Sequence, residues 1–470
     1  MIDLSAYRGQ TLAVMGLGRS GMATARALLR GGATVLAWDD SAARRDDAGG
    51  GAIPVADLNG VDWSGIDALV LSPGIPHSHP APHPVAACAR SADCRIIGDI
   101  ELLVRALPDA RYIGVTGTNG KSTTTTLIGH LLSQAGLEVQ IGGNLGTPAL
   151  ELEPLGRGGT YVIEMSSYQL ELTDPVPFDI AVLLNVSADH LDRHGGMDGY
   201  VAAKRRIFDG QQAGQTAILG ADDDFCAGIA AALAGDGPQD VILISGQTRA
   251  KNGVYAVDHY LYDDIEGKNT PIFALADAAA LPGTHNAQNA CAAYAAGRAA
   301  GIAPDDICAA MLSYPGLAHR QELVARIDGV RYVNDSKATN ADAASRALSC
   351  YQAIYWIAGG QAKEGGLDVL RPLLSHIRHA YLIGEAAPAI AEFLDGRIDC
   401  TISGDLDSAV TSAHGLAQRD VAEDRVVLLS PACASFDQFP NFEARGDSFC
   451  KSVAALSGSA RQVYRDGVAA

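Results

Sequence analysis

The chain has 470 residues, of which 48% are hydrophobic and 19% are charged. This balance is typical of globular proteins and excludes a largely disordered chain. The 54 acidic residues outnumber the 35 Lys and Arg and give a net charge of −19, so the chain lacks the basic character of a nucleic-acid-binding protein. Because a domain usually has about 100–200 residues, we expect about three domains.

Cysteine usage and hydropathy indicate a reducing, aqueous compartment. Nine cysteines are scattered without a C-x-x-C pair or a zinc-binding spacing, which favours free thiols. The first residues lack an apolar signal core, and no apolar run approaches the roughly 20 residues of a membrane helix. We therefore expect a cytoplasmic protein that binds neither membrane nor nucleic acid.

The first segment, residues 1–97, has the alternation of a doubly wound sheet. An apolar strand at Thr11–Met15 leads through a glycine turn into a helical stretch at Met22–Arg30. Further strands are expected at Thr34–Trp38 and Ala68–Leu71. Strands that alternate with helices predict a parallel sheet.

The second segment, residues 98–316, repeats this pattern. A strand at Tyr112–Val115 enters a glycine loop and a helix from about Ser122 to Ala135, and strands follow at Tyr161–Glu164 and Ile180–Asn185. Ligands of such sheets bind beyond the carboxyl ends of the strands. The polar residues at these ends are therefore the candidates for chemistry.

The third segment, residues 317–470, also alternates strands and helices. Its expected strands are Arg331–Asn334, Ile354–Ala358, Ala380–Ile383 and Val426–Leu429. The whole chain thus predicts an α/β fold with domains at 1–97, 98–316 and 317–470.

The glycine loop Gly16–Gly21 matches a dinucleotide-binding fingerprint. It follows a strand, opens a helix and is followed about 20 residues later by Asp39 at the next strand end. Its glycines let the backbone approach a pyrophosphate at a helix N-terminus. Taken alone, this favours an NAD-dependent dehydrogenase. A ligand-free tight turn and a site for another diphosphate, such as a UDP-sugar, remain alternatives.

A second glycine-rich loop, Val115–Ser122, predicts a phosphate site. A phosphate loop needs backbone N–H groups, a lysine for the β- and γ-phosphate oxygens and a hydroxyl for Mg²⁺. Lys121 and Ser122 suit the last two roles. The strict G-x-x-x-x-G-K-[ST] spacing fails, because position 115 is Val and Gly114 lies one residue early.

Later strand ends of the second segment carry candidate metal ligands. Glu164 ends an apolar strand, and Asp189-His190-Leu191-Asp192-Arg193-His194 follows the next one. Mg²⁺ prefers hard oxygen ligands, so Glu164 and Ser122 suit one ion, and the polar setting of His190 suggests a functional role. Lys204, judged from the sequence alone, resembles an ordinary solvated helix lysine.

The last segment has four polar loops next to predicted strands. Their Lys, Ser and Thr side chains would suit an amino-dicarboxylate, although any one of them alone could be a turn residue. The loops are His319-Arg320, Asn334–Asn340, Gly359–Lys363 and Ser430–Asp437.

Together these motifs resemble the Mur ligases over essentially the whole chain. Thr116–Thr123 looks like their ATP loop, including its departure from the strict spacing. His285-Asn286-x-x-Asn289 and His319-Arg320 look like their nucleotide-contacting motifs. Asn334–Asn340 and Ser430–Phe442 resemble the D-glutamate-adding branch, and the Asp-Asn-Pro-Arg motif of the diaminopimelate-adding branch is missing.

The resemblance implies a Rossmann-like UDP-binding domain, a central P-loop ATPase-type domain and a C-terminal Rossmann-like domain. It also implies roles for individual residues, which fall into four groups. UDP would be held by Gly16, Leu17, Gly18, Arg19, Ser20, Asp39, Ser72, Pro73 and Gly74, and the muramoyl part by Asn144 and Ser166. ATP would be held by Gly117, Thr118, Asn119, Gly120, Lys121, Ser122, Thr123, Asn286, Asn289, Arg320, Asp335 and Lys337. One Mg²⁺ ion would use Ser122 and Glu164, and a second would use His190 and a carbamylated Lys204. Glutamate would meet Thr339, Lys363, Ser435, Phe442 and Phe436, the last standing where the best-known relatives have Leu.

The implied reaction joins D-glutamate to UDP-N-acetylmuramoyl-L-alanine in peptidoglycan precursor synthesis. ATP would phosphorylate the alanine carboxylate, and the glutamate amine would attack the acyl phosphate. Lys121, Glu164, His190 and Lys204 would be the catalytic residues of a monomeric enzyme that closes over its substrates. Three alternatives remain: L-glutamate as the added amino acid, a dehydrogenase, which leaves the Lys121 loop unexplained, and a non-catalytic nucleotide-binding module, which leaves the last segment unexplained.

Overall fold

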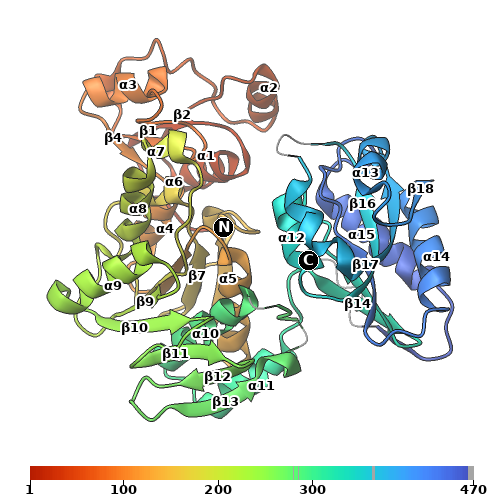
Figure 1. The fold of residues 1–470 in the computed structure, drawn as a ribbon. Helices are drawn as coiled ribbons and strands as arrows, with labels where there is room; N and C mark the ends of the chain where they lie inside the picture. The colour runs from red at the N-terminus through yellow and green to blue at the C-terminus, as the bar shows by residue number, and fades with distance from the viewer. Residues whose placement is uncertain (279, 284, 363–365, 464–470) are drawn as a thin grey trace. The chain divides into compact units, whose positions relative to one another are not determined.

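The computed structural model describes residues 1–278, 280–283, 285–362 and 366–463. The chain forms two compact units (Figure 1). The first contains Met1–Phe273 and Ala287–Met311, and the second contains Ala274–Asn286 and Leu312–Ala470. The predicted division into three domains stays a prediction.

The first sheet has four parallel strands in the order β2-β1-β3-β4. Three of them have the predicted bounds, because each is a short apolar run that becomes buried in the sheet. Helix α1, Arg19–Gly31, begins three residues earlier than expected, within the glycine loop itself. The strands are β1 Thr11–Met15, β2 Thr34–Trp38, β3 Ala68–Leu71 and β4 Arg95–Ile97.

The second sheet, also in the first unit, has nine strands in the order β13-β12-β11-β10-β9-β8-β5-β7-β6. The pairs around β5 are parallel, and β11 and β12 form an antiparallel hairpin. Figure 1 shows β9 to β13 following one another away from the central strands. The strands are β5 Arg111–Thr116, β6 Val139–Gly143, β7 Thr160–Glu164, β8 Ile180–Leu183, β9 Thr216–Gly220, β10 Asp240–Ser245, β11 Gly253–Val257, β12 Tyr260–Asp263 and β13 Thr270–Ala274.

One hydrophobic core joins these two sheets. It contains Leu12 and Val14 of β1 together with Ile163 of β7 and Leu183 of β8, all nearly inaccessible to solvent. The loops at the ends of β1 and β7 therefore rest on one close-packed interior, which resists compression.

The third sheet forms the second unit and has seven strands in the order β18-β17-β16-β19-β15-β14-β20. Strand β16, Ala353–Gly359, lies inside this sheet and is buried along its whole length. Ile354, Trp356 and Ala358 face one core and Tyr355 and Ile357 face the other, as the two-residue strand period requires. The other strands are β14 Glu322–Ile327, β15 Val330–Asn334, β17 Ile377–Ile383, β18 Cys400–Gly404, β19 Arg425–Leu429 and β20 Arg461–Val463. The predicted α/β fold class is therefore confirmed.

Helices connect the strands of all three sheets. Among the described residues we find no helix with the length and apolarity needed to cross a membrane. Besides α1 they are α2 Ala42–Gly50, α3 Pro84–Ser91, α4 Asp99–Ala106, α5 Lys121–Gln134, α6 Ser167–Glu171, α7 Leu191–His194, α8 Met197–Arg205, α9 Asp224–Asp236, α10 His285–Ala299, α11 Pro304–Ser313, α12 Ala341–Leu348, α13 Ala387–Leu394, α14 Leu406–Ala417 and α15 Phe442–Ala455.

The close approach of α1 to the end of β1 yields a stability prediction. A methyl group added at Gly21 would lie 1.7 Å from the carbonyl oxygen of Gly16, whereas one at Gly18 would meet no atom within 4 Å. Gly21→Ala should lower the unfolding free energy by about 1–3 kcal/mol or more, because backbone must move to admit the methyl group. Gly18→Ala is the matched control. Urea denaturation of both variants measures this, and equal midpoints would contradict the close approach.

Candidate functional site

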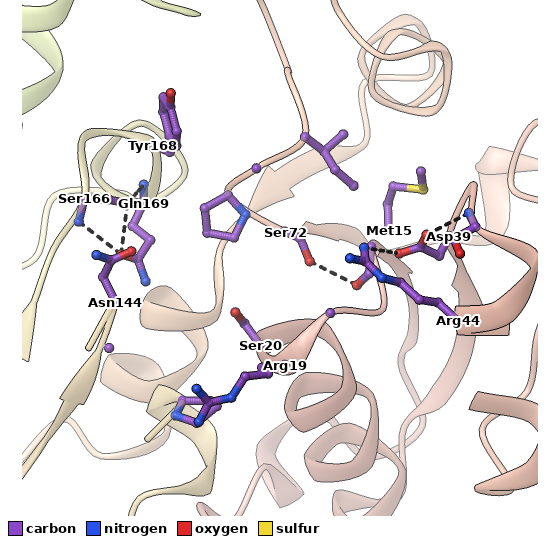
Figure 2. A pocket seen from close by; sticks show the side chains of 18 of the residues that line it. Met15, Arg19, Ser20, Asp39, Arg44, Ser72, Asn144, Ser166, Tyr168 and Gln169 are labelled. Atoms are coloured by element: carbon purple, nitrogen blue, oxygen red, sulfur yellow. Dashed lines mark hydrogen bonds and ion pairs between the residues drawn. The ribbon is translucent and has the colours of Figure 1, made fainter. Parts of the chain in front are cut away.

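A cavity of about 860 Å³ opens in the first unit, between the ends of β1 and β3 and the ends of β6 and β7. Figure 2 shows Asp39, Arg44 and Ser72 on one side and Asn144, Ser166, Tyr168 and Gln169 on the other. Ten residues predicted from the sequence line this cavity: Gly16, Gly18, Arg19, Ser20, Asp39, Ser72, Pro73, Gly74, Asn144 and Ser166.

Asp39 holds the glycine loop in place. Its carboxylate accepts hydrogen bonds from the backbone N–H groups of Leu17 (2.7 Å) and Ser41 (2.9 Å), and Arg44 lies 3.3 Å away. Burial alone would raise the pKa of Asp39, but these donors outweigh it and lower the pKa. The ionised Asp39 carboxylate thus stabilises the glycine loop through hydrogen bonds. Leu17, which lies in the same loop, is buried.

Several cavity residues were missed in the sequence. Arg44 on α2 brings a guanidinium to the edge of the cavity, which the predicted Arg19 also lines; Arg19 donates to the carbonyl oxygen of Gly146 at 2.9 Å. Tyr168 and Gln169 come from α6, where Gln169 forms a capping box with Ser166. The Ala42–Arg45 run was a possible signal, because paired arginines are conspicuous in an acidic chain.

The phosphate loop turns sharply from β5 into α5. Gly120 has a left-handed backbone (φ 84°) and precedes the first residue of the helix. Asn185 fastens the loop, because its backbone oxygen accepts from Thr118 N–H and its side-chain oxygen accepts from Asn119 N–H, both at 2.9 Å. Asn289 lies against the same loop: a methyl group at Gly120 would come within 2.2 Å of its amide oxygen.

Lys121 folds back over this loop. Its ammonium group donates to the carbonyl oxygens of Gly117 and Thr118, each at 2.9 Å. Ser122 and Thr123 follow in the first turn of α5, and Ser122 is buried. A lysine and a hydroxyl at a helix N-terminus are the groups that an anionic phosphate chain requires.

Glu164 ends β7 as a buried carboxylate. One oxygen accepts a short hydrogen bond from the Asn144 amide at 2.6 Å. The other oxygen is buried and has no hydrogen-bond partner within the described part of the chain. Since an unsatisfied buried carboxylate oxygen is costly, this atom suits a cation.

Lys204 is buried, contrary to its reading from the sequence as a solvated lysine. Its side chain is inaccessible, donates to the Gly117 carbonyl oxygen at 2.8 Å and lies 4.7 Å above the Tyr200 ring. Burial, together with the nearby charge of Lys121, lowers the pKa of Lys204 to about 7. At neutral pH a large share of this amine is therefore uncharged and nucleophilic.

His190 lies on the turn before α7, with a left-handed backbone (φ 52°) and a half-exposed side chain. Its ring is 5.2 Å from that of Tyr168. Among the described residues, no three His, Cys, Asp or Glu side chains converge as a metal-binding group. The predicted ligands Ser122, Glu164, His190 and Lys204 would thus have to be completed by water or substrate oxygens, as is common for Mg²⁺.

In the second unit, the loops after β15 and β19 meet. Asp335 is fully buried, accepts from Ser430 Oγ at 2.8 Å and from Gln321 N–H at 3.2 Å, and burial raises its pKa to about 7. The Lys337 ammonium lies 3.8 Å above the Phe442 ring, a cation–π geometry.

Arg445, which the sequence did not suggest, ties these two loops together. Its inaccessible guanidinium donates to the carbonyl oxygens of Ser336 (2.9 Å) and Cys433 (3.1 Å). Burial lowers its pKa to about 10. In the sequence it is one charged residue inside an ordinary helix, so nothing marked it.

The remaining predicted residues of the second unit differ in exposure. Ser435 is buried, and the Phe436 side chain is 68% exposed, so the replacement of Leu by Phe meets no packing constraint within this unit. Arg320 is exposed, Thr339 follows Lys337 in a tight turn, and Asn286 donates to the Pro282 carbonyl oxygen at 2.7 Å. Lys363 lies outside the described residues.

Comparison with known proteins identifies the class. The model of the Mur ligase middle domain matches residues 115–297. The UDP-N-acetylmuramoylalanine–D-glutamate ligase of Rhodospirillum rubrum is 53% identical over 97% of both chains, and that of Caulobacter vibrioides is 50% identical over 97% of this chain and 98% of its own. The chain therefore belongs to the Mur ligase family.

Solved structures agree with this fold. The UDP-N-acetylmuramate–alanine ligase of Thermotoga maritima superposes with a TM-score of 0.57 at 16% identity, covering 95% of this chain and 99% of that one. At this identity the likeness extends to the fold alone.

The lowered pKa of Lys204 gives a pH prediction. Between the folded pKa of about 7 and the unfolded pKa of about 10.4, the folded protein binds fewer protons than the unfolded chain, so the unfolding free energy rises with pH by up to about 1.4 kcal/mol per unit. Lys204→Met should be more stable than wild type at pH 7, and this advantage should shrink towards pH 10. Denaturation curves in bicarbonate-free and magnesium-free buffer measure it; parallel pH curves would show that the amine stays charged.

Proposed function

We propose that this chain is an ATP-dependent ligase that joins D-glutamate to UDP-N-acetylmuramoyl-L-alanine during peptidoglycan precursor synthesis. The main support for this proposal is sequence identity. About half of the residues are identical, over nearly the whole length, to those of relatives named for this reaction. The dehydrogenase alternative finds no support in these comparisons.

The cavity of the first unit would take the UDP end of the substrate. The glycine loop at Gly16 lets a diphosphate approach the backbone at the start of α1. Arg19 and Arg44 supply local positive charge in a chain whose net charge is −19. Asn144 and Ser166 on the opposite wall would meet the muramoyl part, whose alanine carboxylate would then point toward Glu164, the partner of Asn144.

The loop at Gly117–Thr123 would bind ATP. When ATP binds, the Lys121 ammonium would give up its hydrogen bonds to the two loop carbonyl oxygens and donate to phosphate oxygens instead. It would then stabilise the charge that develops as the γ-phosphoryl group moves to the alanine carboxylate. Asn289 would support the loop from α10. The glutamate amine then attacks the acyl carbon, the C–O bond to phosphate breaks, and an amide remains.

The proposed reaction uses two Mg²⁺ ions, for which the unsatisfied buried oxygen of Glu164 is the main support. Glu164 with Ser122 would hold one ion, and His190 with a carbamylated Lys204 the other. The neutral amine of Lys204 would add to CO₂ and lose a proton, which turns a cation into an anionic oxygen ligand. Bound Mg²⁺ would supply Lewis-acid stabilisation of the phosphoryl charge.

The second unit carries the residues proposed for glutamate and a further set proposed for the nucleotide. Thr339, Lys363, Ser435, Phe436 and Phe442 would receive the amino acid, and Asn286, Arg320, Asp335 and Lys337 the nucleotide. The buried hydrogen bonds of Arg445 would hold the loop after β15 and the loop after β19 in fixed positions. We propose the same three-domain boundaries, 1–97, 98–316 and 317–470, a monomer, and a cytoplasmic location.

Removal of the loop lysine should abolish turnover. Lys121→Ala loses a contact that strengthens as charge develops, so kcat should fall about 100-fold or more, which corresponds to about 3 kcal/mol. Lys251→Ala, at an exposed lysine, is the matched control. ADP release with both substrates measures the effect, with circular dichroism to verify folding. Normal turnover of a folded Lys121→Ala protein would remove the loop from the mechanism.

The accepted amino acid should be D-glutamate. With both carboxylates held, inversion at the α-carbon moves the amine out of line with the acyl phosphate, and a misplacement of about 1 Å can cost about 100-fold. The experiment is ADP release from ATP and UDP-N-acetylmuramoyl-L-alanine with each amino acid in turn, including both enantiomers. Faster ligation of L-glutamate would refute the assignment of D-glutamate but not the proposed mechanism. The absence of ADP release with every amino acid would refute the proposed function.

A further inference from the structure

The turn His190–Gly195 contacts two segments that are remote in the sequence. One is residues 73–79, which follow β3 and begin with cavity-lining Pro73. The other is α6, which carries Tyr168 on the opposite side of the cavity. All three parts lie within the first unit. The helix of this turn, α7, has a single turn, so its own backbone bonds do little to fix where His190 points.

Arg193 connects this turn to the first of the two segments. Its guanidinium donates to the carbonyl oxygens of Ile75 (2.8 Å), Pro73 (3.4 Å) and His79 (3.3 Å), and it lies 4.9 Å above the Tyr168 ring. A planar guanidinium can serve several acceptors at once, whereas an ammonium is a single flexible point. Arg193 thus fixes the segment that lines the cavity against the turn that carries His190.

His194 connects the same turn to α6. Its inaccessible ring bonds Glu171 through Nδ1 (2.8 Å) and Ser167 through Nε2 (2.9 Å). Glu171 also bonds His77 at 3.1 Å. Burial would raise the pKa of Glu171, but the two histidines outweigh it and lower the pKa to about 2. The turn is therefore held from both walls of the cavity.

We infer that Arg193 is a positioning residue, which couples occupation of the UDP end of the cavity to the placement of His190. This inference rests on the proposed function, since it gives the cavity a UDP ligand and His190 a role in catalysis. Pro73 and Ile75 are both cavity residues, so a bound diphosphate that orders their backbone also orders the carbonyl oxygens that Arg193 holds. The backbone N–H of Arg193 donates to the His190 carbonyl oxygen at 3.0 Å, so the residue that holds the cavity segment also closes the turn that begins at His190. A substrate fragment far from the reacting carboxylate would thereby prepare the catalytic turn, as remote binding energy often does.

Hydrogen–deuterium exchange with UDP alone tests this coupling in the wild-type protein. UDP should slow exchange of the amides in residues 16–21 and 72–75 and also of those in residues 190–196. Arg193→Lys should keep the protection at 16–21 and lose that at 190–196. Protection of the loops without protection of 190–196 in the wild type would overturn the inference. The absence of any UDP protection would instead count against the proposed substrate site.

Kinetics provide a second readout with a matched control. Arg90 on α3 donates to the His77 carbonyl oxygen at 2.8 Å and so holds the same segment from a different helix. Arg193→Lys should lower kcat about tenfold and change the Kd for UDP less than about threefold, whereas Arg90→Lys should leave kcat within twofold of wild type. An unchanged kcat in Arg193→Lys, or an equal loss in both variants, would overturn the coupling role.

Discussion

Two lysine side chains donate to one carbonyl oxygen, that of Gly117 at the end of β5, from distances of 2.9 Å for Lys121 and 2.8 Å for Lys204. The arrangement brings two amines together where little solvent can screen them, and full charge on both is therefore unfavourable. Burial first, and then the charge of Lys121, lowers the pKa of Lys204 to about 7, so Lys204 is the amine that loses its charge. Lys121 is only partly buried and keeps access to a ligand. The proposed chemistry depends on this asymmetry, because one amine must meet phosphate as a cation and the other must be neutral.

The neighbouring Glu164 carboxylate acts on the Lys204 amine through its charge, which opposes the lowering of the Lys204 pKa by burial. One carboxylate oxygen of Glu164 accepts a hydrogen bond from the Asn144 amide. The other oxygen has no hydrogen-bond partner among the described residues. With one buried oxygen unsatisfied within the described part of the chain, this carboxylate leaves the site incomplete by itself. Phosphate oxygens, a carbamate and divalent cations are the groups that would complete it, as the proposed function requires.

The fold was largely predictable, because each central strand is an apolar run flanked by glycine or polar residues, and burial follows directly from that composition. Glu164 and the Gly117–Ser122 loop could be picked out for a related reason, since they stand at strand ends, and His190 because it lies in a polar run after a strand. Lys204 was not, since it lies on α8, where only the packing of Tyr200 and the Gly117 carbonyl shows that this face is buried. Arg193 and Arg445 were not predictable either, because their partners are backbone carbonyl oxygens, which leave no signature in a sequence.

These two arginines show a shared solution to holding functional loops in an acidic protein. Arg193 binds three carbonyl oxygens of one segment, and Arg445 binds carbonyl oxygens of two loops in the other unit. Ion pairs at the surface would contribute little and weaken with salt. Bonds from a guanidinium to carbonyl oxygens change with neither moderate salt nor the titration of an acid, and they leave the neighbouring carboxylates to other partners. The loops are thus fixed by groups that neither compete with an anionic substrate nor respond to the proton transfers of the reaction.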